Sequence, residues 1–471
     1  MAVKYPSGPV LSIETGKSVW TVTILWGIMP FPPNRGARKN RLEAPLLSNL
    51  ISFVGIFVLL GLAWALSNNR RRFPWRVAGW GLGLQLTLAV ILLRTPWGQM
   101  IFGGARNFVN RLLGFTDAGA SFLWGNLYRT SEELIAYANP EAGYFQVTNS
   151  VTGQLMPIGT VFVIHILPTI IFFSSLMALL YHLGVMQKLI AGMAWVMRKT
   201  MGTSGSESLS CAANVFVGQT EAPFVIKPYL GSMTNSEIMA VMVGGFATVA
   251  GGVMAAYVRF GIDAGHLLAA SVMSAPAALV VAKIMYPETE ESPTRGSVSL
   301  QIPREYSNVL DAAAGGASVG LKLAANVGAM LLAFIALVAM VNYGLGFLGT
   351  SLQQVFGWVF SPVAWVMGVP WSEAAIFGNL LGTKIAVNEF MGYIELGNAA
   401  ANGSLSPRSV VIGTYALCGF ANFSSIAIQI GGIGTIAPER RSDVAALGLK
   451  AMFGGALASW LTATIAGMLV G

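Results

Sequence analysis

Two glutamates lie in apolar stretches where a carboxylate is costly. Glu221 lies within VFVGQTEAPFVIKP (residues 215–228), and Glu389 lies within the triplet NEF (388–390). At membrane depth a carboxylate costs about 2.5–3.5 kcal/mol on insertion scales, so it persists where it faces a cavity or a partner. Two carboxylates with neighbouring amides suit a neutral, hydroxyl-rich solute better than an anion, because a carboxylate can accept two hydroxyl groups at once.

The composition is that of a membrane protein. The chain has 471 residues, of which 54% are hydrophobic and 10% are charged, whereas soluble domains are about 25% charged. Long apolar segments recur along its length and predict an all-α polytopic membrane protein. The net charge of +8 is explained by loop lysines and arginines on the cytoplasmic side. The sequence has no basic stripe with interleaved aromatic residues, so no nucleic-acid partner is expected. The HExxH, Walker and GxSxG motifs are absent, which argues against an enzyme.

The apolar segments predict about eight membrane spans. The basic cluster at 68–76 places the first loop in the cytoplasm, so the first span starts outside and both termini lie outside. Residues 1–44 are expected to be a flexible extension or a start-site artefact. Residues 45–160 are expected to hold the first two spans and an outside interfacial segment, together a scaffold, and 287–317 a cytoplasmic connector. The expected spans are 47–66, 75–93, 161–184, 236–258, 266–286, 318–346, 407–433 and 445–470.

Two further segments, 203–232 and 372–397, are apolar but interrupted by glycine, proline and polar residues. Non-helical backbone is tolerated at membrane depth only where protein or water surrounds it. We therefore expect two re-entrant hairpins whose tips meet near the middle of the membrane. Helix ends at such tips leave carbonyls without partners, and these bind small hard cations. Asn214 and Thr248, with nearby backbone, are candidates to ligate a monovalent ion.

The order of these elements repeats. A span, a broken segment, a span containing Gly-Phe-Ala and a further span occur in 161–286 and again in 318–471. The triplet is 245–247 in the first unit and 419–421 in the second. By the span count the two units have opposite topology. Inverted repeats with interrupted helices are typical of secondary transporters.

Several motifs resemble the signature stretches of the concentrative nucleoside transporters. They are GQTEAP at 218–223, NEF at 388–390 and GFANFSS at 419–425, supported by 244–252 and 275–288. The resemblance covers residues 45–471. It implies sodium-coupled symport of nucleosides into the cell by an elevator-type alternating-access mechanism in a homotrimer. Because the chain lacks the extra N-terminal spans of animal members, it resembles a bacterial inner-membrane form in contact with lipid.

The resemblance also implies roles for individual residues. On the first hairpin, the residues that would face the nucleobase are Gln219, Thr220 and Glu221. Val253 of the fourth span would lie beside the base, and Phe420 would line the base pocket. Three residues would hold the ribose hydroxyls: Glu389, Asn422 and Ser425. Sodium, the implied coupling ion, would be bound largely by backbone carbonyls at Asn214, Val217, Thr248 and Val249, with no organic cofactor. The Gly-Gln pair at 218–219 resembles members that accept purine and pyrimidine nucleosides.

Several alternatives remain open from the residues. The same fold could be driven by protons if one buried glutamate carries the proton. An integral membrane enzyme could use the two carboxylates as acid and base, and crossing hairpins superficially resemble a channel. The glutamates could also be structural, with Glu221 paired to Lys227 and Glu389 paired to Lys384.

Overall fold

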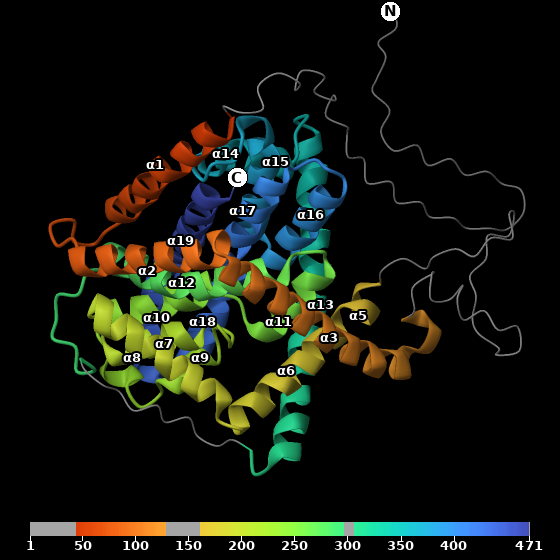
Figure 1. Ribbon diagram of the computed structural model, residues 1–471, viewed down its shortest axis with the longest axis horizontal. Coiled ribbons are helices and arrows are strands. Elements are labelled where there is room, and N and C mark those ends of the chain that lie inside the picture. The colour runs from red at the N-terminus through yellow and green to blue at the C-terminus, as the bar shows by residue number, and fades with distance from the viewer. Residues whose placement is uncertain (1–43, 129–160, 296–305, 471) are drawn as a thin grey trace, which may run out of the picture. The chain divides into compact units, whose positions relative to one another are not determined.

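The computed structural model describes residues 44–128, 161–295 and 306–470 (Figure 1). Within these ranges the chain is helical and contains no strand, and Pro45–Gly471 forms one compact unit. Residues 1–43, and the acidic part of the expected outside loop at 129–160, lie outside the described residues. The first half contains α1 (Ala44–Ala65), α2 (Trp75–Arg94), α3 (Pro96–Trp124), α5 (Phe162–His165), α6 (Leu167–His182), α7 (Val185–Met201), α8 (Gly205–Ala213), α9 (Ala222–Val225), α10 (Asn235–Ala247), α11 (Gly251–Arg259) and α12 (Ala264–Met285). The second half contains α13 (Val309–Gly346), α14 (Leu352–Val366), α15 (Trp371–Ala386), α16 (Glu389–Ala401), α17 (Pro407–Leu417), α18 (Phe423–Ile436) and α19 (Arg441–Leu469).

The helices confirm a polytopic membrane protein. In the described residues, 7 helical stretches are long and apolar enough to cross a membrane, or up to 8 if one bent pair is counted as a span. These 7 stretches overlap all the expected spans except 407–433. That span is broken into two short helices, α17 and α18. The sixth span begins at Val309 and not near residue 318, so its first turns occupy residues expected in the connector.

Two spans are broken at their middle. Helix α10 ends at Ala247 and α11 begins at Gly251, while α17 ends at Leu417 and α18 begins at Phe423. The repeated Gly-Phe-Ala triplets do not occupy equivalent places. The first forms the last turn of α10, whereas the second lies inside the break after α17. The match between the two units therefore lies in the order of their elements and not in the alignment of this triplet.

Each expected hairpin is a pair of helices joined by an irregular tip. In the first hairpin, α8 and α9 flank the tip at 214–221, and in the second, α15 and α16 flank residues 387–388. A helix that the sequence analysis did not predict, α14, precedes the second hairpin and is bent by 116° relative to α15.

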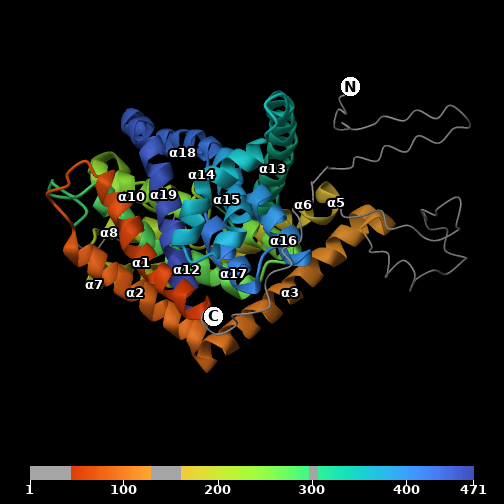
Figure 2. The ribbon, with the colours of Figure 1, turned by 90° about the horizontal axis from the view of Figure 1, so that it is seen from above.

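Helices α6 and α13 lie side by side (Figures 1 and 2). Glycines permit this approach, because a Cβ at Gly316 would lie 2.6 Å from the Ala178 Cβ and one at Gly320 would lie 2.8 Å from the Ile171 Cα. Small residues let membrane helices pack backbone to backbone. Helices α10 and α17, which end at the breaks, pack against both α12 and α19, and α8 of the first hairpin packs against α10 and α12.

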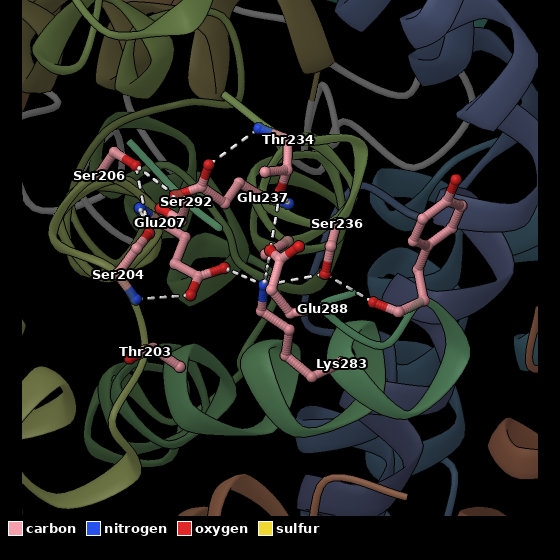
Figure 3. Close-up of polar contacts among 12 residues, drawn as sticks. Thr203, Ser204, Ser206, Glu207, Thr234, Ser236, Glu237, Lys283, Glu288 and Ser292 are labelled. Atoms are coloured by element: carbon pink, nitrogen blue, oxygen red, sulfur yellow. Dashed lines mark hydrogen bonds and ion pairs between the residues drawn. The ribbon is translucent and has the colours of Figure 1, made fainter. Parts of the chain in front are cut away.

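A buried polar cluster anchors the base of the first hairpin (Figure 3). Lys283, near the end of α12, forms an ion pair with Glu207 at 2.7 Å, and their side chains are only 5% and 2% exposed. Glu207 also completes the capping box that begins α8. Thr294, which follows α12, hydrogen-bonds to Glu237 in the capping box of α10. The cluster thus joins the first turns of α8 and α10 to the segment after α12.

Candidate functional site

The two broken helices touch at their breaks. Gly419, in the α17–α18 break, has φ 108°, and a Cβ there would lie 2.4 Å from the Phe246 carbonyl oxygen near the end of α10. Only glycine combines this left-handed backbone with so close an approach. The ends of α10 and α17 are therefore held in direct contact.

The tip of the first hairpin lies against the α10–α11 break. The Gly251 N–H donates to the Phe216 carbonyl at 2.9 Å. The Ser271 hydroxyl of α12 donates to the Val215 carbonyl at 3.0 Å. The first bond ties the tip to the α10–α11 break and the second ties it to α12, so residues 214–217 lie beside the break that contains Thr248 and Val249.

The expected ion-binding residues gather at this contact, and all are buried: Asn214, Val217, Thr248 and Val249. The Asn214 amide donates to the Ser210 carbonyl at 3.1 Å, which leaves its Oδ1 buried without a hydrogen-bond donor. The Thr248 hydroxyl donates to the Gly244 carbonyl at 2.8 Å and keeps its lone pairs available as acceptors. A buried acceptor without a donor demands a partner, and oxygen ligands of this kind suit a small hard cation.

A chain of hydrogen bonds links the polar residues of both halves. Glu389 accepts from the Tyr257 hydroxyl and from the Asn422 amide, each at 3.1 Å. The Asn422 Oδ1 caps α18 by accepting from the Ser425 N–H at 2.9 Å. The Ser425 hydroxyl in turn accepts from the Gln219 amide at 3.0 Å. Four of the expected substrate-binding residues therefore form one network that joins both hairpins.

Sequence reasoning missed Gln429. This residue lies one turn after Ser425 on α18 and is 1% exposed. Its amide donates to the Gln219 Oε1 and to the Met242 carbonyl, each at 3.1 Å. A Cβ on Gly245 would lie 2.7 Å from its Nε2, so the glycine makes room for the amide. The available signal was the four-residue spacing from Ser425, which places both side chains on one face of the helix.

The other expected substrate residues lie around this network. Glu221 is exposed at the hairpin tip and accepts from the Gly218 N–H at 3.1 Å. Thr220 lies beside it, opposite Gly432 of α18. Val253 is buried on α11, and Phe420 is half-buried in the α17–α18 break.

The alternative pairing of Glu389 with Lys384 is not observed. In the described part of the chain no ion pair joins these two side chains. Lys384 is directed instead at backbone carbonyls of Ala416 and Cys418, at 3.0 and 3.1 Å. Glu389 keeps its two side-chain donors, Tyr257 and Asn422. The glutamate is thus held by neutral groups.

Two helix breaks in contact, two hairpins and a buried polar network that joins them are the features of a secondary transporter of the inverted-repeat type. Three family models match the chain in succession. They are the sodium-dependent nucleoside transporter N-terminus at 54–127, a nucleoside recognition domain at 163–264, and the sodium-dependent nucleoside transporter C-terminus at 266–467. The chain therefore belongs to the concentrative nucleoside transporter family, whose members are transporters and not enzymes.

Individual relatives agree with this assignment. The chain is 43% identical to an uncharacterized transporter of Haemophilus influenzae over 90% of this chain and 99% of that protein. It is 42% identical to sodium/nucleoside cotransporter 1 of Rattus norvegicus, covering 89% of this chain but only 64% of the rat protein. A solved structure of the transporter CNTnw in an inward-facing, substrate-bound state is 42% identical with a TM-score of 0.79, covering 90% of this chain and 98% of that chain. A CNTnw variant in an outward-facing state gives a TM-score of 0.82 at 42% identity, covering 90% and 99%.

Proposed function

We propose that this protein is a sodium-coupled symporter that carries nucleosides into the cell. The observation that carries the proposal is the network from Gln219 through Ser425 and Asn422 to Glu389. It places a carboxylate, two amides and a hydroxyl at the meeting point of two hairpins. Such a set can accept and donate hydrogen bonds to both a base edge and vicinal hydroxyls.

Each end of the network has its own role in the proposal. Glu389, Asn422 and Ser425 hold the ribose, with the carboxylate accepting two hydroxyl hydrogens. At the other end, the first hairpin supplies the groups that face the nucleobase: Gln219, Thr220 and Glu221. Val253 and Phe420 give the base an apolar wall. The Gln429 amide donates to the Gln219 Oε1 and so fixes the orientation of the Gln219 amide, and we add Gln429 as a positioning residue.

Sodium binds, in this proposal, where the first hairpin tip meets the α10–α11 break. The support is the buried Asn214 Oδ1 that has no donor, beside the Thr248 hydroxyl. The named cotransporter relative and the matched family descriptions point to the same ion. Because Val217 and Gln219 belong to one tip, ion binding would order the residues that meet the base.

Transport would proceed by elevator-type movement of the hairpin-bearing helices past a scaffold in a homotrimer. The CNTnw structures in inward- and outward-facing states support alternating access. Only 11% of the α13 spanning window is buried, so its apolar surface is available to lipid and to neighbouring copies. The location we propose is a bacterial inner membrane, with both termini outside.

The test is radiolabelled uridine uptake into proteoliposomes. We expect uptake under an inward sodium gradient and little uptake when choline replaces sodium. Uptake driven by a proton gradient alone would keep the substrate and move the coupling to a carboxylate. If neither gradient drives uptake of uridine, adenosine or other nucleosides, the proposed function is wrong.

A further inference from the structure

The second half of the site contains a buried cation of its own. Lys384 lies two residues before the end of α15, just before the tip of the second hairpin, and is 0% exposed. Its ammonium donates to the carbonyl oxygens of Ala416 at 3.0 Å and Cys418 at 3.1 Å. Both carbonyls belong to the end of α17, where the helix breaks. The ammonium thus lies at a helix C-terminus, where the carbonyls carry partial negative charge.

The break makes this cation necessary. Helix α17 stops at Leu417, so the carbonyls of its last turn have no helical N–H four residues on. The Cys418 carbonyl also accepts from the Ser459 hydroxyl. For the Ala416 carbonyl, Lys384 is the partner that replaces the missing N–H. Unpaired carbonyls at this depth would be costly.

The first repeat has the same kind of break, and in the described residues no lysine donates to the carbonyls at the end of α10. Helix α10 stops at Ala247, and the hairpin tip that meets this break carries Asn214. Neither α8, α10 nor the tip at 214–221 contains a lysine or arginine. The Asn214 Oδ1 is buried there with no donor.

We infer that the Lys384 ammonium takes, in the second repeat, the place that an exchangeable monovalent cation takes in the first. The inference rests on the sodium site proposed above. Because Lys384 is part of the hairpin, its ammonium pairs with the carbonyls at the end of α17 throughout the transport cycle. It therefore does not couple transport to an ion gradient. The protein therefore needs one exchangeable cation per transport cycle where its symmetry would provide for two.

The experiment compares the wild type, Lys384→Ala and Lys384→Arg as full-length purified protein. The apparent Tm is measured across sodium concentrations, with choline holding ionic strength constant. Lys188→Ala, an exposed lysine on α7, is the matched control. Because a ligand that binds the folded state stabilises it by mass action, we expect the Hill coefficient for sodium to rise from about 1 in the wild type toward about 2 in Lys384→Ala. Lys384→Arg and Lys188→Ala should keep the wild-type dependence.

Two outcomes would overturn the inference. Lys384→Ala could show the wild-type sodium dependence, or it could be destabilised without any added response to sodium. A wild type that does not respond to sodium would refute the proposed sodium site, and with it the comparison on which this inference rests. A wild type that responds to sodium, with no added response in Lys384→Ala, would refute the inference alone.

Discussion

At the residue scale, the site consists of side chains whose polar atoms hydrogen-bond to one another. Gln219 donates to Ser425 and accepts from Gln429, so both ends of its amide have fixed roles. Glu389 is held between Tyr257 and Asn422. Tyr257 also stacks on Tyr393, with ring centroids 4.2 Å apart. A solute that binds here meets donors and acceptors in set positions, which favours selectivity for hydroxyl patterns.

Glu389→Gln should lower uridine uptake at least tenfold while the protein still reaches the membrane. The variant keeps the shape but loses the charged acceptor, and hydrogen bonds to charged groups are worth about 1.5–3 kcal/mol. The measurement is initial uptake rate normalised to protein in the proteoliposomes. Glu395→Gln, in the same hairpin but bonded to Asn379 and Thr383, serves as the matched control. Wild-type uptake by Glu389→Gln would refute the ribose assignment.

Thr248→Ala should weaken apparent sodium affinity several-fold and nucleoside affinity much less at saturating sodium. The substitution removes a hydroxyl oxygen at the proposed ion site without touching the polar network. Thr248→Ser keeps the oxygen and should behave like the wild type. Sodium dependence of uptake is the readout. An unchanged half-saturating sodium concentration in Thr248→Ala would place the ion elsewhere.

At the element scale, both hairpins are tied to neighbouring helices by polar contacts. The tip of the first is tied to the α10–α11 break, and its base is tied by the Glu207–Lys283 pair. The second is tied through Lys384 and through the Tyr393 hydroxyl, which donates to the Thr414 carbonyl at 2.9 Å. Short helices such as α8 and α9 are not stable alone. Their position therefore depends on these tertiary bonds.

Glu207→Gln should lower the apparent Tm in detergent clearly. Removing one partner of a buried pair typically costs about 3–5 kcal/mol, and here Lys283 would keep only its longer contact with Glu288, at 3.3 Å. Adding Lys283→Met to this variant should recover part of the loss, because the buried ammonium, left with Glu288 as its only charged partner at 3.3 Å, is then gone. Asp443→Asn, which breaks the more exposed pair with Arg440, should cost less than about 1 kcal/mol. Equal effects from Glu207→Gln and Asp443→Asn would contradict this account of the cluster.

At the scale of the whole molecule, two inverted units place their breaks against each other. The contact of Gly419 with the end of α10 brings the second unit to the first. The bond from Gln219 to Ser425 joins the first hairpin to the second unit. The proposed ion and substrate sites share the tip of the first hairpin, so binding at one should affect binding at the other.

Sodium and uridine together should therefore raise the apparent Tm by more than the sum of their separate effects. The coupling is reciprocal, since each ligand must change the affinity for the other by the same factor. The measurement is thermal unfolding in detergent with sodium, uridine, both or neither, with choline balancing the salt. Strictly additive shifts would show that the two sites are independent.

The sequence by itself determined the class of protein and the two glutamates of interest. Apolar length predicts membrane spans because the bilayer sets how many residues a helix needs. Glu221 and Glu389 are conspicuous because a carboxylate among apolar residues requires an explanation. The hairpins follow from glycine and proline in segments too interrupted to span.

Only the tertiary structure decided which groups meet. Contacts between residues far apart in the chain decide three features of the site. They are the exact break in the seventh span, the role of Gln429 and the carbonyl partners of Lys384. A glutamine or lysine in an apolar helix has the same local pattern whether it faces a ligand, a backbone carbonyl or another side chain. Its partner is chosen by how the helices pack, and packing of inverted units is not encoded in local periodicity.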